Sequence, residues 1–175
     1  MNLKKQKITK NKKAMLRKKC RMINLVVSDV DGVLTDGGMY YGQKGEVMKK
    51  FNTKDGMGVE LLNLQNIKTV LLTKENSKIA IKRGEKIKAA AILVNIENKS
   101  LELRKICKKF GIKKENIAYI GDDVNDLQVM SDVGLSACPN DAILDIQRNS
   151  NYVCVRKGGE GAFREFADLI LHLRD

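Results

Sequence analysis

Short, largely apolar runs recur along the chain, and segments with helical spacing separate them. We expect strands at residues 23–27, 68–73, 89–94, 117–120, 134–137 and 152–155. Polar residues do not alternate regularly with apolar ones inside these runs. Unbroken apolar runs of this length are typical of parallel strands that are buried on both faces of a sheet.

Amphipathic segments lie between the expected strands. The clearest runs from residue 98 to residue 110, where Leu103, Ile106, Cys107 and Phe110 follow the i, i+3, i+4, i+7 rule. We expect further helices at residues 56–66, 77–88, 124–131 and 142–147, and a last one that ends near His172. Alternating strands and helices predict an α/β fold, a Rossmann-like parallel sheet with helices on both faces.

One segment has a different pattern. Residues 37–41 and 46–51 flank the sequence Gly42-Gln43-Lys44-Gly45. Two β-prone runs around a glycine-bearing turn predict a β-hairpin directly after the first strand.

The 175 residues suit one domain with a full hydrophobic core. The net charge of +12 is concentrated at the start, because residues 1–22 hold ten Lys or Arg side chains and no acid. The remainder carries 23 basic and 21 acidic side chains, about +2. We therefore divide the chain into a basic arm, residues 1–22, and a globular domain, residues 23–175.

We expect the arm to be disordered and solvated, with Met15 or Met22 as alternative start sites. It has no apolar core or small-residue cleavage site of a secretory signal. A mitochondrial-type presequence is conceivable, although the segment is Lys-rich and has no Ser. A basic arm can also contact nucleic acid or anionic lipid.

Hydrophobic residues make up 43% of the chain, and no apolar run reaches membrane-spanning length. The four cysteines are far apart and form no Cys-x-x-Cys pair. This usage predicts a reducing, cytoplasmic location, with no disulfide framework and no zinc site.

Polar residues follow several of the expected strands. Asp29 and Asp31 follow the first strand, Thr73 ends the second, and Asp122 follows the strand at residues 117–120. Lys99 opens the helix at residues 98–110. The carboxyl ends of parallel strands share one edge of the sheet, where ligands bind in open α/β folds, so these side chains should converge.

Such a group suits phosphoryl transfer, which needs a nucleophile, a proton for the leaving oxygen and positive charge around the phosphoryl group. Asp29 would attack phosphorus, and Asp31 would protonate the leaving alkoxide and then activate water. Asp122 would hold Mg²⁺, a hard cation that prefers oxygen ligands. Thr73 would donate to a phosphoryl oxygen, and Lys99 would offset its charge. Individually, a strand-end Thr is usually a helix cap and a Lys is usually solvated.

These residues, in this order, resemble the four motifs of the haloacid dehalogenase superfamily of phosphatases. The motifs are Asp29-x-Asp31-Gly, Thr73, Lys99 and Gly121-Asp122-Asp123-x-x-Asp126. The resemblance runs from about residue 23 to the C-terminus. It implies Mg²⁺ as cofactor, with Asp29, the main-chain carbonyl of Asp31 and Asp122 as its ligands.

Two further segments resemble the capless branch that removes phosphate from 3-deoxy-2-ulosonic acids. They are Phe51-Asn52-Thr53-Lys54-Asp55-Gly56 and the glycine-rich segment at residues 158–165. The resemblance implies a small-molecule sugar-acid phosphate as substrate, either 3-deoxy-D-manno-octulosonate 8-phosphate or a nonulosonate 9-phosphate, in cell-surface sugar biosynthesis. The substrate-binding residues it implies are Phe51, Asn52, Lys54, Asp55, Gly158, Gly159 and Glu160.

The chain departs from that branch at two places. Where its octulosonate phosphatases typically have Thr-Gly-Arg, the sequence is Thr73-Lys74-Glu75. Together with Arg83 and Lys86, Glu75 resembles relatives that act on nine-carbon sugar acids, so the substrate chain length is open. A carboxylate accepts hydrogen bonds from sugar hydroxyls, and a basic pair can hold a carboxylate. Lys54 replaces an Arg, which keeps the charge but loses the bidentate fork.

Motif spacing independently predicts that there is no cap domain. Only 41 residues separate Asp31 from Thr73, and 25 separate Thr73 from Lys99. An open site admits water, which weakens electrostatic catalysis. In the resembled family, tetramers cover the site: hairpins pair between subunits, and the glycine-rich segment contributes to a neighbour's site. We therefore expect a homotetramer, although the hairpin could instead fold over its own subunit.

Two other classes of protein compete with the enzyme. A receiver-type signalling domain also uses clustered acids, a Thr, a Lys and Mg²⁺, but its adjacent acids follow the first strand, whereas here Asp122 and Asp123 come late. A nucleic-acid-binding protein would have to act through residues 1–22, because aromatic residues are only 5% of the chain and the body has no basic, aromatic-rich motif.

Overall fold

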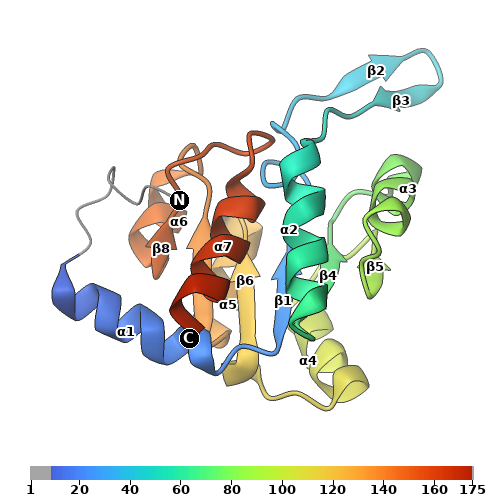
Figure 1. The fold of residues 1–175 in the computed structure, drawn as a ribbon. Helices are drawn as coiled ribbons and strands as arrows, with labels where there is room; N and C mark the ends of the chain where they lie inside the picture. The colour runs from blue at the N-terminus through green and yellow to red at the C-terminus, as the bar shows by residue number, and fades with distance from the viewer. Residues whose placement is uncertain (1–8, 175) are drawn as a thin grey trace.

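The computed structural model describes residues 9–174, which fold around a six-stranded parallel sheet (Figure 1). The strand order is β5-β4-β1-β6-β7-β8. The strands are β1 (Leu25–Ser28), β4 (Lys68–Leu72), β5 (Ala91–Leu93), β6 (Ile117–Ile120), β7 (Leu135–Cys138) and β8 (Tyr152–Val153). Each neighbouring pair is parallel. This confirms the α/β fold that the sequence predicts.

Helices cover both faces of the sheet. They are α1 (Lys10–Arg21), α2 (Thr53–Leu64), α3 (Lys78–Lys86), α4 (Lys99–Phe110), α5 (Leu127–Asp132), α6 (Leu144–Asn149) and α7 (Ala162–Arg174). Side chains of α1, α2, α3 and α7 share one hydrophobic core with the sheet, and those of α4, α5 and α6 share a second. Strand β1 supplies both cores, since Val26 faces the first and Leu25 and Val27 face the second.

The predicted hairpin forms a separate two-stranded sheet of β2 (Tyr40–Gly42) and β3 (Gly45–Met48). It projects away from the body of the molecule above α2 and α3 (Figure 1). Within residues 9–174, the segments that join the main strands contain this hairpin, helices and short connections, and no cap domain. The active-site edge is therefore covered by little of the chain's own structure.

The expectation of a disordered arm is wrong for residues 10–21, which form α1 and pack against α7. Leu16 and Cys20 are fully buried one turn apart, so the helix has an apolar stripe despite its lysines. Thr9 caps its start by accepting a hydrogen bond from the Lys12 amide, and Lys19 donates to the Gly134 carbonyl at 2.5 Å. Residues 1–8 of the expected arm lie outside the described residues.

Other differences from the predicted elements are small. Helix α2 begins three residues early, at Thr53, because the Asn52 side chain accepts a hydrogen bond from the Lys54 amide and caps it. The expected helix at residues 124–131 divides into a 3₁₀ turn, Val124–Asp126, and α5. A second 3₁₀ turn, Lys114–Asn116, precedes β6.

All four cysteines are free thiols, as predicted. Among residues 9–174, no helix combines the length and the apolar character that crossing a membrane requires.

Candidate active site

The loop after β1 carries the first two carboxylates. The Asp29 amide donates to the Ile120 carbonyl at 3.0 Å, so β6 holds the end of β1 in place. The Asp29 side chain is almost fully buried, and one of its oxygens, Oδ1, accepts a hydrogen bond from the Val30 amide at 2.7 Å. Gly32 turns the chain with φ of +76°, and a Cβ there would lie 1.9 Å from Oδ2 of Asp122. Glycine is therefore required where the first and last motifs meet.

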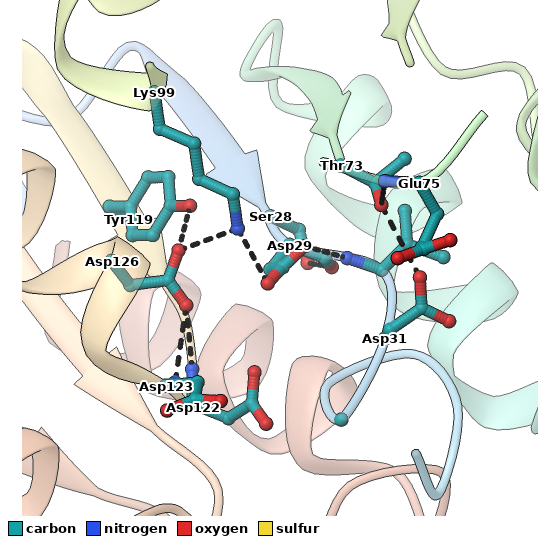
Figure 2. Close-up of polar contacts among 12 residues, drawn as sticks. Ser28, Asp29, Asp31, Thr73, Glu75, Lys99, Tyr119, Asp122, Asp123 and Asp126 are labelled. Atoms are coloured by element: carbon teal, nitrogen blue, oxygen red, sulfur yellow. Dashed lines mark hydrogen bonds and ion pairs between the residues drawn. The ribbon is translucent and has the colours of Figure 1, made fainter. Parts of the chain in front are cut away.

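Lys99 joins this loop to the far side of the site. Its side chain reaches inward from the first turn of α4, which Asn98 caps. The buried ammonium nitrogen lies 2.6 Å from Oδ2 of Asp29 and 2.7 Å from Oδ1 of Asp126 (Figure 2). Lys99 therefore places a buried positive charge against Asp29, and its expected role of offsetting the charge of a phosphoryl group stays a prediction.

Asp126 is fully buried and already accepts hydrogen bonds at both oxygens. Besides Lys99, the Tyr119 hydroxyl donates to Oδ1 at 2.6 Å. The amides of Asp122 and Asp123 donate to Oδ2 at 2.9 and 3.4 Å (Figure 2). A carboxylate has about four acceptor positions, so these donors use the capacity of Asp126. Its role is therefore to fix the Asp122 loop and Lys99.

The acids form a group that fits a divalent metal ion. Asp29, Asp122 and Asp126 each offer an oxygen, and these atoms lie within 4.8 Å of one another. Because Asp126 is engaged by four donors, Asp29 and Asp122 are the carboxylates with capacity for a cation. Within residues 9–174, no hydrogen-bond donor reaches the Asp122 carboxylate. A set made only of oxygen donors suits Mg²⁺.

The pKa values of these acids reflect the excess of negative charge. Burial raises the pKa of Asp29 well above its usual range, and the nearby charge of Asp126 adds to it, while Lys99 opposes both. Burial and Asp126 likewise raise the pKa of Asp122 to about 7. One ammonium does not compensate three clustered carboxylates, and a bound cation would relieve the imbalance.

Asp31 and Thr73 face each other across the mouth of the site. The Thr73 hydroxyl donates to Oδ2 of Asp31 at 3.3 Å and accepts a hydrogen bond from the Glu75 amide at 3.1 Å. Figure 2 shows Asp31, Thr73 and Glu75 together on the side opposite Asp126. The predicted site residues of all four motifs therefore converge at the carboxyl edge of the sheet.

A cleft of about 240 Å³ opens between these groups. It is lined by Asp29, Asp31, Gly32, Gly37, Thr73, Lys74, Glu75, Asp122, Asp123 and Asn125. Five of these ten residues are Asp or Glu and one is a lysine, Lys74; Lys99 is not among them but contacts Asp29, which is.

None of the residues of the segment 51–56 lines the cleft. The Asn52 amide group donates to the Gly159 carbonyl at 3.2 Å, and Lys54 lies near Gly161. Asp55 is 1% exposed and accepts a hydrogen bond from the Arg164 amide at 2.9 Å, which joins α2 to α7. In a single chain these contacts are structural.

The glycine-rich segment packs under the first motif. Gly158 and Gly159 are buried, and a Cβ on Gly158 would lie 1.9 Å from the Gly32 carbonyl oxygen. The Gly159 amide donates to the Val33 carbonyl at 3.0 Å, whereas Glu160 is exposed. Both glycines thus support the Asp29–Asp31 loop of their own chain. Their expected contact with a neighbour's substrate stays a prediction.

Of the three residues expected to select the substrate, only Glu75 lines the cleft. Arg83 and Lys86 line a separate cavity of about 580 Å³ together with residues of α2. Arg83 donates to the Asn52 carbonyl at 2.8 Å and lies over the Phe51 ring, 5.5 Å from its centroid. One chain therefore does not bring the basic pair to Glu75.

Three residues in or beside the site were not assigned a role from the sequence: Asp126, Tyr119 and Lys49. Asp126 belongs to the fourth motif, so its position could have identified it. Tyr119 is within an apolar strand and Lys49 follows the hairpin, and neither position signals a contact with the site. Their partners become evident only once the strands and the hairpin are placed.

Residues 45–164 match the family model of the haloacid dehalogenase-like hydrolases. The chain is 37% identical over 153 residues to the 3-deoxy-D-manno-octulosonate 8-phosphate phosphatase of Salmonella typhi. The match covers 87% of this chain and 81% of that relative. The corresponding enzyme of Escherichia coli strain K12 matches with the same identity and coverage.

The chain is also similar to solved structures of 3-deoxy-D-manno-octulosonate 8-phosphate phosphatases. A 3-deoxy-D-manno-octulosonate 8-phosphate phosphatase from Moraxella catarrhalis, in complex with magnesium, phosphate and a KDO molecule, is 31% identical with a TM-score of 0.87. The match covers 90% of this chain and 91% of that one. The phosphatase from Yersinia pestis is 34% identical with a TM-score of 0.89, covering 92% and 87% of the two chains.

Proposed function

Because the chain belongs to the haloacid dehalogenase-like hydrolases, we propose that it is a Mg²⁺-dependent phosphatase that removes the terminal phosphate from a 3-deoxy-2-ulosonic acid. The substrate would be 3-deoxy-D-manno-octulosonate 8-phosphate or a nonulosonate 9-phosphate, on the route to a cell-surface sugar. One observation carries the proposal: the buried Asp29 carboxylate lines the acidic cleft and lies 2.6 Å from the Lys99 ammonium.

Asp29 is the proposed nucleophile. One of its oxygens attacks phosphorus and forms an aspartyl-phosphate, while the bond from phosphorus to the sugar oxygen breaks. Lys99 contacts Asp29 directly and offsets the negative charge of the phosphoryl group. The Thr73 hydroxyl, at the other side of the cleft, donates to a phosphoryl oxygen.

Asp31 transfers the protons in both halves of the reaction. As an acid it gives its proton to the sugar oxygen as that oxygen leaves phosphorus. As a base it then takes a proton from the water that attacks the aspartyl-phosphate, which regenerates Asp29 and releases inorganic phosphate. The 3.3 Å contact with Thr73 supports this role, because it holds Asp31 at the cleft mouth.

Asp29, Asp122 and the main-chain carbonyl of Asp31 are the proposed ligands of Mg²⁺. When bound, the cation would neutralise charge on the phosphoryl oxygens and on the two carboxylates. The pKa of Asp122, which burial and Asp126 raise to about 7, supports a site that accepts a positive ion.

We further propose that the enzyme works in the cytoplasm as a homotetramer. Four free thiols suit a reducing compartment. The hairpin exposes large apolar side chains, at Met39, Tyr40, Tyr41, Val47 and Met48. Both edges of the two-stranded sheet lack a partner strand within residues 9–174, which favours pairing with other copies of the chain.

A tetramer would also complete the substrate site. The cleft of about 240 Å³ is small for a whole sugar-acid phosphate, so part of the substrate would extend beyond it. Arg83 and Lys86 line a different cavity, so they would act on substrate bound to a neighbouring subunit, whose Glu75 they would complement. Phe51, Asn52, Lys54 and Glu160 would border the same composite site, whereas Asp55, Gly158 and Gly159, which are buried in their own chain, would support it from within.

A substrate panel tests the proposal. Release of inorganic phosphate would be measured with octulosonate 8-phosphate, nonulosonate 9-phosphates and hexose 6-phosphates, each with Mg²⁺ and with a chelator. We expect Mg²⁺-dependent turnover, with kcat/KM highest for a 3-deoxy-2-ulosonic acid. A Glu75→Arg variant should shift the ratio towards the eight-carbon substrate. No phosphate release from any ester would instead favour a receiver-type domain.

The basic side chains keep the nucleic-acid alternative open only for the N-terminal part of the chain. Helix α1 carries seven Lys or Arg residues and no acid. Salt-sensitive nucleic-acid binding that survives when the exposed Lys10, Lys13, Arg17 and Lys18 are replaced with Gln would revive this function for the body of the protein.

A further inference from the structure

Lys49 is a buried lysine that none of the four motifs includes. It directly follows β3, at the base of the hairpin, and its side chain has no exposed surface. Lysine is rarely buried unless it is paired. Here its ammonium nitrogen lies 2.5 Å from Oδ1 of Asp31 and 2.7 Å from Oε1 of Glu46. The hairpin therefore places a positive charge directly on the proposed proton-transfer residue.

A second contact fixes Lys49 to the body of the protein. The Ser77 hydroxyl donates to Oε2 of Glu46 at 2.6 Å. Ser77 caps α3, since its side-chain oxygen accepts a hydrogen bond from the Ala80 amide. A continuous set of hydrogen bonds thus runs from the start of α3 through Glu46 and Lys49 to Asp31. These contacts hold the ammonium group in one position.

The two Asp31 oxygens have different partners as a result. Lys49 donates to Oδ1, and the Thr73 hydroxyl lies 3.3 Å from Oδ2. An ammonium group has three donors and no acceptor, so an oxygen bound to it is the less favourable place for a proton. Oδ2, the oxygen on the Thr73 side, is therefore the one that the ammonium leaves free for proton transfer, and Thr73 lines the cleft.

We propose that Lys49 is a positioning residue for proton transfer by Asp31. This role of Lys49 rests on the proposed phosphatase function and adds a residue to its mechanism. By holding Oδ1, Lys49 orients Oδ2 towards the sugar oxygen that leaves phosphorus. The bond between phosphorus and that oxygen breaks as the proton moves from Oδ2 to the sugar oxygen, which leaves Asp31 as a carboxylate paired with Lys49.

Packing alone does not explain why a charged side chain is buried at Lys49. Removing an ammonium from water costs several kcal/mol, which two hydrogen-bonded carboxylates offset. A methionine would fill a similar volume without that cost. The adjacent Lys50 shows the contrast, since its side chain is 60% exposed and contacts Asp36 at 3.2 Å.

The leaving group of the substrate distinguishes positioning from a structural role. A sugar alkoxide must be protonated as it leaves, whereas nitrophenolate leaves without a proton. The experiment compares kcat for octulosonate 8-phosphate and p-nitrophenyl phosphate in wild type, Lys49→Met, Lys49→Arg and Lys50→Met, all with saturating Mg²⁺.

We expect Lys49→Met to lower kcat for the sugar phosphate by about 10- to 100-fold, a fraction of what a general acid supplies, and kcat for p-nitrophenyl phosphate by less than about threefold. Lys49→Arg should recover part of the loss, and Lys50→Met should match wild type with both substrates. In an Asp31→Asn background, Lys49→Met should have little further effect.

An equal loss with both substrates, or no loss, would overturn the proposal. If Lys49→Met fails to fold because Glu46 and Asp31 are left facing each other, the double variant Glu46→Gln, Lys49→Met removes one of those charges and must give the same leaving-group dependence. A wild-type protein that hydrolyses neither ester would instead refute the phosphatase function itself.

Discussion

The Lys99 ammonium nitrogen lies 2.6 Å from Oδ2 of Asp29, and both side chains are almost completely buried. The contact connects the end of β1 to the first turn of α4, the helix that follows β5, and β4 lies between β1 and β5 in the sheet. The same nitrogen also donates a hydrogen bond to Oδ1 of Asp126 at 2.7 Å. One buried cation thus serves two carboxylates, and the site depends on it for both stability and charge balance.

Replacing Lys99 with Met should therefore destabilise the metal-free protein. Two buried carboxylates would lose the cation that they share, and breaking a buried pair costs roughly 3 kcal/mol. Mg²⁺ should restore more stability to the variant than it adds to wild type, because the cation supplies the missing charge. Urea unfolding with a chelator and with Mg²⁺ measures both effects. Lys105→Met, an exposed substitution on the same helix, should change stability by less than about 0.5 kcal/mol.

Asp55 should make the stability depend on pH. Burial raises the pKa of Asp55 from 3.8 to about 6, although the Arg164 amide and the charges of Arg83, Arg156 and Arg164 partly oppose it. Its Oδ2 is buried without a hydrogen-bond partner. The folded protein therefore holds a proton that the unfolded chain releases near pH 4, so the free energy of unfolding falls as pH rises from about 4 to about 6.

An Asp55→Asn variant isolates this effect, because it lacks the titrating group and keeps an oxygen for the Arg164 amide. Each unit of pKa shift is worth ~1.4 kcal/mol, and part of the effect is already lost at pH 4.5, so wild type should lose about 2 kcal/mol relative to the variant between pH 4.5 and pH 7. Urea unfolding at pH 4.5, 5.5 and 7 in a chelator gives the difference. A difference that does not vary with pH would contradict the proposed burial of the charge.

Gly158→Ala should impair catalysis more than folding. The new Cβ would lie 1.9 Å from the Gly32 carbonyl oxygen, so the loop that carries Asp29 and Asp31 would have to move. A displacement of that loop should lower kcat/KM by at least about tenfold. Gly111→Ala is the matched control: φ is +64° there and no atom lies within 4 Å of the new Cβ, so it strains the backbone by about 1 kcal/mol away from the site. If both variants lose equal activity, the effect is one of stability.

The hairpin should carry the subunit contacts. Tyr41 and Val47 are about 60% exposed, and placing a charge on each with Tyr41→Asp and Val47→Asp should reduce the molar mass in sedimentation below that of a tetramer. Turnover of the sugar-acid phosphate should fall with it, because the cleft would stay open. Leu101→Asp, an equally apolar and exposed position on α4, should leave the mass unchanged. A tetramer that survives the hairpin substitutions would refute this assembly.

Much of the site follows from the sequence because parallel topology is a strong constraint. Once residues 23–27 and 117–120 are recognised as buried neighbouring strands, Asp29 and Asp122 must meet at one edge, and the structure brings their oxygens within 4.8 Å. Lys99 could be added because a helix that starts near that edge can direct its first turn into the cleft.

The missed features depend on tertiary contacts that periodicity does not encode. The sequence did not predict helix α1, because the segment is rich in lysine and only Leu16 and Cys20 reach the core. Lys49 has the sequence environment of a solvated hairpin residue, and only the fold of the hairpin base buries it against Asp31. Arg83 and Lys86 lie on the predicted helix, but the path of α3 directs them away from Glu75 in the same chain.

The central claim is that Asp29 becomes phosphorylated during turnover. The protein would be mixed with Mg²⁺ and excess octulosonate 8-phosphate, quenched with acid within the first turnovers, digested and analysed by mass spectrometry. We predict one phosphoryl group on the peptide that contains Asp29, and none in Asp29→Asn, which should keep its fold and lose at least about 10³-fold in kcat. A phosphoryl group on another residue, or appreciable turnover by Mg²⁺-loaded Asp29→Asn, would contradict the account.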